Sequence, residues 1–394
     1  MQRYLVCVTD VNNNKFYQQT DNENGTWEAK WGRVGCDHPQ TQTYQSNVWD
    51  KKYQEKLKKG YKDITGLRSE TTTSFSYSNI AEKDIQNLLN SLQKYAKQTI
   101  QTNYTISSEN VTQSQIDAAQ DIINQMATSL YKLTTSELNE KLMELYTIIP
   151  RKMGNVKNHL LSSTDDKKQA KKLIANEQDL LDVMSQQVGM NVQPKTSGQT
   201  LEDALGIKVS KPDNNEIDVI KKMMGDNVKL FKQAYKIENI NTQKAFESQK
   251  TKSVKPWTKL LFHGSRNENW LSIIKTGLLI RPSNAVLTGA MWGAGIYFAD
   301  KSQKSLGYTS LNGSYWTSGK SKQAFLAIYE VNTGMEYRLE KHSDECYKMD
   351  DKKLKTKGDY DSLFAKGGID LRNNEFVIYN QNKSTIKYLI EISE

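Results

Sequence analysis

Apolar and polar positions alternate with a period of two near the start of the chain, which predicts strands. Residues 4–8, 15–20 and 25–34 follow this pattern, and clusters of Asn, Asp and Gly separate them. A Lys-rich segment after Trp49 then predicts a helix. We therefore expect residues 1–70 to fold as a small α+β module.

The pattern then changes to the three- and four-residue spacing of amphipathic helices. Four groups of apolar residues have this spacing: Ile85, Leu88, Leu89 and Leu92; Ile116, Ala119, Ile123 and Met126; Leu138, Leu142, Leu145 and Ile149; Leu173, Leu180, Leu181, Met184 and Val188. Thr134 and Glu137 form a capping box before the third group, and Pro150 ends it. Because a Ser/Thr-rich linker at residues 71–79 precedes this region, residues 80–215 predict an all-α bundle.

Short apolar runs return in a third region, residues 216–394, which a predicted strand at residues 230–239 opens. Three later runs each place one polar side chain on or beside a predicted strand: His263, Tyr297 and Glu375. Apolar residues follow Glu375 on both faces of its strand, so burial makes an idle charge there costly. We expect these three distant segments to converge on one cleft.

Length and composition exclude several classes of protein. A chain of 394 residues exceeds what one hydrophobic core usually serves. Its 54 Lys and Arg residues outnumber the 45 Asp and Glu residues, and this net charge of +9 suggests a polyanionic partner, although a solvated surface can carry the same surplus. Three cysteines without a CxxC pair support neither a disulfide framework nor a zinc site, so we expect a reducing compartment and no metal. Because no apolar run approaches about 18 residues, we expect a soluble protein without a membrane partner that is not secreted.

Three motifs in order carry a family resemblance: LLFHGS at residues 260–265, GAGIYFAD at residues 293–300 and NEFVIY at residues 374–379. With Ser305 and Tyr308, they resemble the His-Tyr-Glu signature of the poly(ADP-ribose) polymerases, diphtheria-toxin-like ADP-ribosyltransferases that cleave NAD. The resemblance covers residues 255–394. It implies a mixed α/β, mostly antiparallel catalytic domain inside a multidomain α+β protein, with NAD+ as substrate. A dehydrogenase is disfavoured because the GxGxxG fingerprint is absent.

The same resemblance assigns roles to the site residues. It implies that His263 binds the adenosine ribose and that Glu375 stabilises the oxocarbenium ion and polarises an acceptor hydroxyl. The main chain of Gly264 and the hydroxyl of Ser305 would bind the carboxamide, while Tyr297 and Tyr308 would sandwich the nicotinamide ring. The remaining predicted NAD-binding residues are Ser265, Gly295, Phe298 and Ala299. For Lys304, beside Ser305, we expect an exposed side chain, and the alternative is a contact with the acceptor or with a phosphate of the substrate.

Two segments before the catalytic region also resemble parts of this family. WEAKWGRVG at residues 27–35, with a second motif at residues 49–61, looks like the WGR domain, which binds DNA-break ends. Its predicted nucleic-acid contacts are Lys30, Trp31, Gly32 and above all Arg33, although Trp27 or Trp31 can equally be a core residue. LMELYTIIP at residues 142–150, followed by Gly154, looks like the regulatory helical domain, which implies autoinhibition until DNA binds.

The resulting prediction is a DNA-break-dependent ADP-ribosyltransferase that binds 5′-phosphorylated ends and modifies proteins, itself included. An accessory factor that completes the site stays open, as does the location, nuclear in a eukaryote and otherwise cytoplasmic. The chain departs from the family at Leu279, where many members have Arg, at Ala290 with Trp292, and across residues 342–369. The product can therefore be polymeric or single, and the alternative class is a nucleic-acid-binding regulator with an inactive transferase scaffold.

Overall fold

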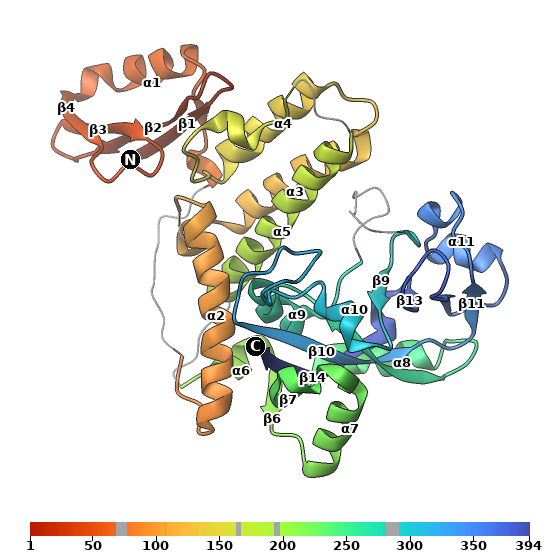
Figure 1. Ribbon diagram of the computed structural model, residues 1–394. Helices are drawn as coiled ribbons and strands as arrows, with labels where there is room; N and C mark the ends of the chain where they lie inside the picture. Colours follow the sequence, from red (N-terminus) through yellow and green to blue (C-terminus); the bar gives the residue numbers. More distant parts are fainter. Residues whose placement is uncertain (68–76, 107, 163–166, 193–197, 281–290) are drawn as a thin grey trace. The chain divides into compact units, whose positions relative to one another are not determined.

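The computed structural model describes residues 1–67, 77–106, 108–162, 167–192, 198–280 and 291–394, and these form two compact units (Figure 1). The first unit takes its described residues from positions 1–67 and 97–192, and the second from positions 77–96, 198–280 and 291–394. Most of the predicted linker at residues 71–79, and Ala290, lie outside the described residues. The division into three domains stays a prediction.

The first unit opens with an antiparallel five-stranded sheet in the order β4-β3-β2-β1-β5, with helix α1 across one face (Figure 1). The elements are β1 Gln2–Val8, β2 Asn14–Asp21, β3 Thr26–Arg33, β4 Gln40–Gln45, α1 Trp49–Lys58 and β5 Lys62–Asp63. Trp27 is 1% exposed and belongs to the core, which was the alternative that the sequence analysis gave for this residue. The edge strand β4 was not predicted, because its sequence QTQTYQ has no alternating apolar face.

Helices make up the rest of the first unit. They are α2 Lys83–Asn103, which contributes to both units, α3 Gln113–Ser129, α4 Thr135–Ile148 and α5 Lys167–Val192. The capping box of Thr134 and Glu137 is confirmed, and α4 ends two residues before Pro150. Beyond that proline, the buried Arg151 forms an ion pair of 2.6 Å with Glu177 of α5.

The second unit contains two sheets, which confirms the mixed and mostly antiparallel prediction. One has the order β6-β7-β14-β10-β8, and the other has the order β11-β12-β13-β9, in which only β11 and β12 run parallel. The elements are α6 Leu201–Leu205, β6 Ile207–Ser210, α7 Asn214–Met224, β7 Phe231–Asn239, α8 Ile240–Lys250, β8 Thr258–Gly264, α9 Trp270–Thr276, β9 Ile296–Phe298, α10 Ser302–Leu306, β10 Gln323–Asn332, β11 Glu336–Leu339, α11 Asp351–Thr356, β12 Ser362–Ala365, β13 Glu375–Ile378 and β14 Ser384–Ser393. Because β6 pairs with β7, the first sheet begins before residue 216.

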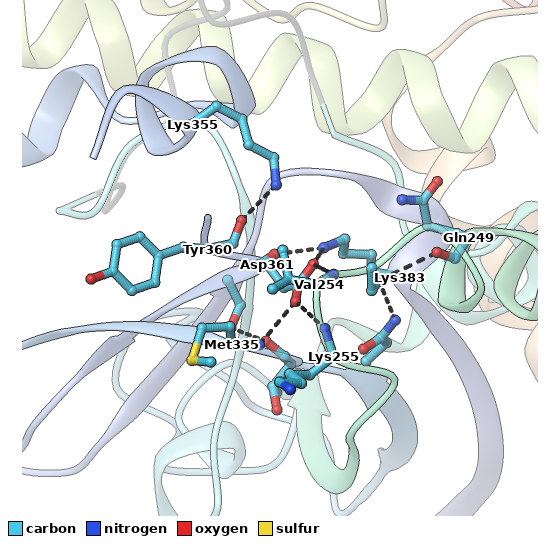
Figure 2. Close-up of polar contacts among 12 residues, drawn as sticks. Gln249, Val254, Lys255, Met335, Lys355, Tyr360, Asp361 and Lys383 are labelled. Carbon is cyan, nitrogen blue, oxygen red and sulfur yellow. Dashed lines mark hydrogen bonds and ion pairs between the residues drawn. The ribbon is translucent and has the colours of Figure 1, made fainter. Parts of the chain in front are cut away.

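A buried ion pair ties the loops of the second unit together, as Figure 2 shows. Asp361 accepts hydrogen bonds from the main-chain nitrogens of Val254, Lys255 and Met335 at 3.0, 3.1 and 2.9 Å. The Nζ atom of Lys383 lies 2.9 Å from its Oδ1 atom, and both side chains are at most 4% exposed. One carboxylate thus joins the segments that precede β8, β11, β12 and β14.

Candidate active site

Three strands of the second unit carry the predicted catalytic residues. His263 is the penultimate residue of β8, Tyr297 the middle residue of β9 and Glu375 the first residue of β13. β9 pairs with β13 along its whole length. Phe262 and Ala299 exchange main-chain hydrogen bonds of 2.7 and 3.0 Å, which join β8 to the residue that follows β9. The sheet connections therefore bring the three segments to one place.

Gly264 ends β8 in close contact with α10. A Cβ atom at this position would overlap the carbonyl oxygen of Ser305 and lie 3.3 Å from the Cβ atom of Tyr308. Since a backbone oxygen cannot turn aside as a long side chain can, only glycine allows this approach. Ser305 is 4% exposed. The main chain of Gly264 thus lies beside both residues that the sequence predicted as its partners at nicotinamide.

The carboxylate of Glu375 forms an ion pair with Lys304 of α10. The Glu375 side chain is 9% exposed and that of Lys304 is 16% exposed, so our expectation of an exposed lysine was wrong. Burial lowers the pKa of Lys304, and the charge of Glu375 partly opposes that effect. No periodic pattern could have revealed this role, because α10 has only five residues. The ion pair therefore fixes the position of the Glu375 carboxylate inside the protein.

His263 is held as a neutral imidazole. Its Nδ1 atom lies 3.0 Å from the main-chain oxygen of Tyr297, and because a carbonyl only accepts, Nδ1 carries the proton. Burial lowers the pKa of His263, although this hydrogen bond acts in the opposite direction. The ring also packs against Phe298 and Tyr329 at centroid distances of 5.8 and 6.0 Å. Nε2 is therefore left as a hydrogen-bond acceptor.

Both predicted stacking tyrosines are uncharged near neutral pH. Burial raises the pKa of Tyr297, and its hydroxyl donates to the oxygen of Gly293 at 2.8 Å while accepting from the nitrogen of Trp292 at 3.0 Å. Burial, with a smaller effect from the charge of Glu375, raises the pKa of Tyr308 to about 12. The charge of Glu375 also contributes to the raised pKa of Tyr297.

The other predicted NAD-binding residues form the framework of the site. Phe298 and Ala299 are each 2% exposed and belong to the core. A Cβ atom at Gly295 would lie 2.5 Å from a methyl group of Val377, so glycine allows the segment before β9 to approach β13. Ser265 accepts a hydrogen bond of 3.1 Å from the side chain of Asn269. In the structure these four residues support β8 and β9.

Comparisons with known proteins decide the family. Residues 214–394 match the poly(ADP-ribose) polymerase catalytic domain. The chain is 35% identical over 189 residues to a poly(ADP-ribose) polymerase-like protein, 100L, of Invertebrate iridescent virus 6. This alignment covers 47% of the chain and 98% of the viral protein. The chain belongs to the poly(ADP-ribose) polymerase family. It is an NAD+ ADP-ribosyltransferase.

Two further relatives match the chain over more residues than its catalytic domain contains. Protein 101L of the same virus is 33% identical over 210 residues, which is 52% of the chain and 85% of that protein. Poly(ADP-ribose) polymerase 1 of Gallus gallus is 27% identical over 346 residues, which is 79% of the chain. The match covers 31% of the Gallus gallus polymerase.

The residues predicted to contact DNA lie in the first unit, more than about 200 positions along the chain before the candidate active site. Trp31 is half-buried and packs against the core that contains Leu5 and Tyr17. The guanidinium group of Arg33 donates to the main-chain oxygens of Met153 and Gly154 at 3.2 and 2.8 Å. It makes two more hydrogen bonds to Asn12, while Lys30 and Gly32 are half-buried on the same strand. Arg33 therefore connects β3 to the segment after α4.

The described residues of the chain contain neither a metal-binding cluster nor a membrane-spanning helix. No group of three or more His, Cys, Asp and Glu side chains there is arranged to hold a metal ion. Within the same ranges, no helix combines the length and the apolar character needed to cross a membrane.

Proposed function

We propose that this chain is a DNA-break-dependent poly(ADP-ribose) polymerase that transfers ADP-ribose from NAD+ to proteins, itself included. The proposal rests on the ion pair of Glu375 and Lys304, which is largely shielded from solvent and joins β13 to α10, the helix that also carries Ser305. A carboxylate positioned in this way suits a reaction that develops positive charge on a sugar.

The two halves of NAD+ bind through different groups. His263 accepts a hydrogen bond at Nε2 from a hydroxyl of the adenosine ribose, which fixes that half without proton transfer. The main chain of Gly264 and the hydroxyl of Ser305 hold the carboxamide. Tyr297 and Tyr308 stack on the nicotinamide ring, whose positive charge favours aromatic faces. The proximity of Gly264, Ser305 and Tyr308 supports these roles.

The reaction breaks the bond between ribose C1′ and the nicotinamide nitrogen. The electron pair of that bond leaves with nicotinamide, which becomes neutral, and C1′ takes on oxocarbenium character. Glu375 accepts a hydrogen bond from a hydroxyl of this ribose and so favours the cation. The acceptor oxygen then bonds to C1′ and loses its proton to Glu375, from which it passes to solvent. When the acceptor is a ribose hydroxyl of ADP-ribose, the product is a polymer.

DNA ends are proposed to bind at the first unit, where α1 concentrates positive charge. Its cationic residues are Lys51, Lys52, Lys56 and Lys58. Such lysines supply the salt-dependent, sequence-independent attraction to phosphates that binding to any broken end requires. Arg33 hydrogen-bonds to the segment after α4, which supports a role for β3 in linking DNA binding to the helices. The helices in turn hold the NAD+ site closed until DNA favours the open state.

The test follows the transfer of label from NAD+ labelled in its adenosine half, with and without nicked, 5′-phosphorylated DNA. We expect labelled chains of increasing length that depend on DNA. Glu375→Gln keeps the shape of the side chain but removes its charge, so it abolishes elongation. The control Glu238→Gln changes an exposed carboxylate on β7 and keeps wild-type products.

Each other outcome contradicts part of the proposal. Equal transfer with and without DNA overturns the DNA dependence. A single labelled adduct of constant size overturns polymer synthesis, and the absence of any transfer favours an inactive scaffold. Long polymers from Glu375→Gln at near wild-type rates overturn the role of Glu375.

A further inference from the structure

The segment between α10 and β10 forms a compact loop that exposes two aromatic side chains. The main chain of Ser321 donates to Ser310 at 2.9 Å, and that of Asn312 donates to Ser321 at 2.8 Å, which close the base of the loop. Inside it, the hydroxyl of Ser314 donates to the oxygen of Leu306 at 2.8 Å. The loop is therefore fixed to α10, the helix that carries Lys304 and Ser305.

Trp316 lies at the tip of this loop and is 64% exposed, which is unusual for so large an apolar ring. One of its faces is nonetheless occupied. The indole stacks on the ring of Tyr308, with centroids 5.9 Å apart and an angle of 18° between the planes. The main-chain nitrogen of Trp316 donates to the oxygen of Gly307 at 2.9 Å, so the loop holds the indole in register with Tyr308.

We propose that Trp316 is a positioning residue for nicotinamide binding, which it supports by fixing the ring of Tyr308. The inference rests on the proposed function of Tyr308 as a stacking partner of nicotinamide. A ring has two faces, and because Trp316 covers one of them, the other is presented to the ligand. Tyr308 is 38% exposed, so without the indole its ring gains rotational freedom that nicotinamide binding must remove.

The experiment measures nicotinamide binding to the full-length chain by calorimetry, alongside the KM and kcat for NAD+, with nicked, 5′-phosphorylated DNA present throughout so that the proposed closed state does not block the site. We expect Trp316→Ala to weaken nicotinamide binding and raise KM by about three- to tenfold, the range of one lost aromatic pair, with kcat little changed. Trp316→Phe keeps a stacking ring and restores most of the affinity. The matched control Trp257→Ala removes a 58% exposed indole elsewhere in the same unit and leaves both constants unchanged.

A double-mutant cycle separates this inference from the proposed function. In a Tyr308→Ala background, Trp316→Ala is expected to have no further effect, because the ring that it fixes is gone. If Tyr308→Ala itself leaves nicotinamide binding unchanged, the proposed role of Tyr308 is wrong. If Tyr308→Ala weakens binding while Trp316→Ala does not, only the role of Trp316 is overturned. Equal losses from Trp316→Ala in both backgrounds also overturn it, since they would show that Trp316 acts without Tyr308.

Discussion

Lys304 and Glu375 depend on each other because Glu375 is buried and Lys304 is half-buried beside it. Removing one charge from such a pair leaves the other without a partner in a medium that solvates it poorly, which typically costs about 3–5 kcal/mol. The charged form of Glu375 is the one that the proposed reaction requires. In this arrangement Lys304 therefore holds the carboxylate in position.

We predict that Lys304→Met lowers kcat at least about tenfold at neutral pH, because the carboxylate of Glu375 loses the partner that pairs with it inside the protein. Steady-state measurements of kcat for NAD+ with nicked, 5′-phosphorylated DNA test this. Lys301→Met, which changes an exposed lysine one turn earlier, is the control and keeps the wild-type kcat. A kcat for Lys304→Met equal to that of the wild type contradicts the coupling.

At the scale of the elements, Asp361 joins several loops of the second unit. Burial raises the pKa of this carboxyl group, but hydrogen bonds from Met335, Lys383 and Lys255 outweigh burial, so its pKa is lowered overall. A carboxyl group whose pKa is lowered by folding stabilises the protein above its unfolded pKa. That stabilisation is lost as the pH falls through the lowered value.

We predict that Asp361→Asn destabilises the second unit by about 3–5 kcal/mol at neutral pH, because it leaves the charge of Lys383 buried without a counter-ion. The difference from wild type starts to shrink below about pH 4, the usual pKa of an aspartate in the unfolded chain, and it is lost once the pH falls below the lowered pKa of the folded carboxyl group. Urea unfolding at several pH values measures it. Asp359→Asn, at an exposed position two residues away, is the control. A difference that does not change with pH contradicts the ionic role of Asp361.

The sequence predicted those elements that carry a local signal, such as a run of apolar residues or a helix cap. It missed those elements that depend on pairing or packing with residues distant in the chain. β8, β9 and β13 were predicted because apolar residues fill them, and α4 because of its capping box. β6 has only four residues and acquires its identity from pairing with β7. The position of Lys304 could not be predicted either, because it follows from the packing of a five-residue helix against β8 and not from any pattern within the helix.

At the scale of the whole molecule, the proposed control of activity requires a chain whose first unit, with its Lys-rich helix α1, precedes the catalytic region. The first residue of the fragment that tests this control must be chosen from the sheet that contains β6 and β7, and not from the predicted domain boundary at residue 216. β6 pairs with β7, and Glu216 of α7 bonds to Lys236 and Tyr388, so a fragment that begins near Asp218 loses part of the fold. A start at Gly198 keeps both features.

We predict that residues 198–394 cleave NAD+ without DNA at a rate near that of the DNA-bound full-length protein, since no helices then hold the site closed. Release of nicotinamide measures the rate, and circular dichroism establishes that the fragment is folded. A folded but inactive fragment contradicts the autoinhibitory role of the helices. A full-length protein that is equally active without DNA does so as well.

The exposed position of Trp316 also has a consequence for spectroscopy. Of the seven tryptophans of the chain, only Trp257 and Trp316 are exposed in the part that the structure describes, while Trp27, Trp270 and Trp292 are buried. Exposed indoles emit at longer wavelengths than buried ones and are quenched more readily by small solutes. In a Trp257→Phe protein, the red-shifted emission therefore comes mainly from Trp316, so intrinsic fluorescence reports ligand occupancy beside Tyr308 without an added dye.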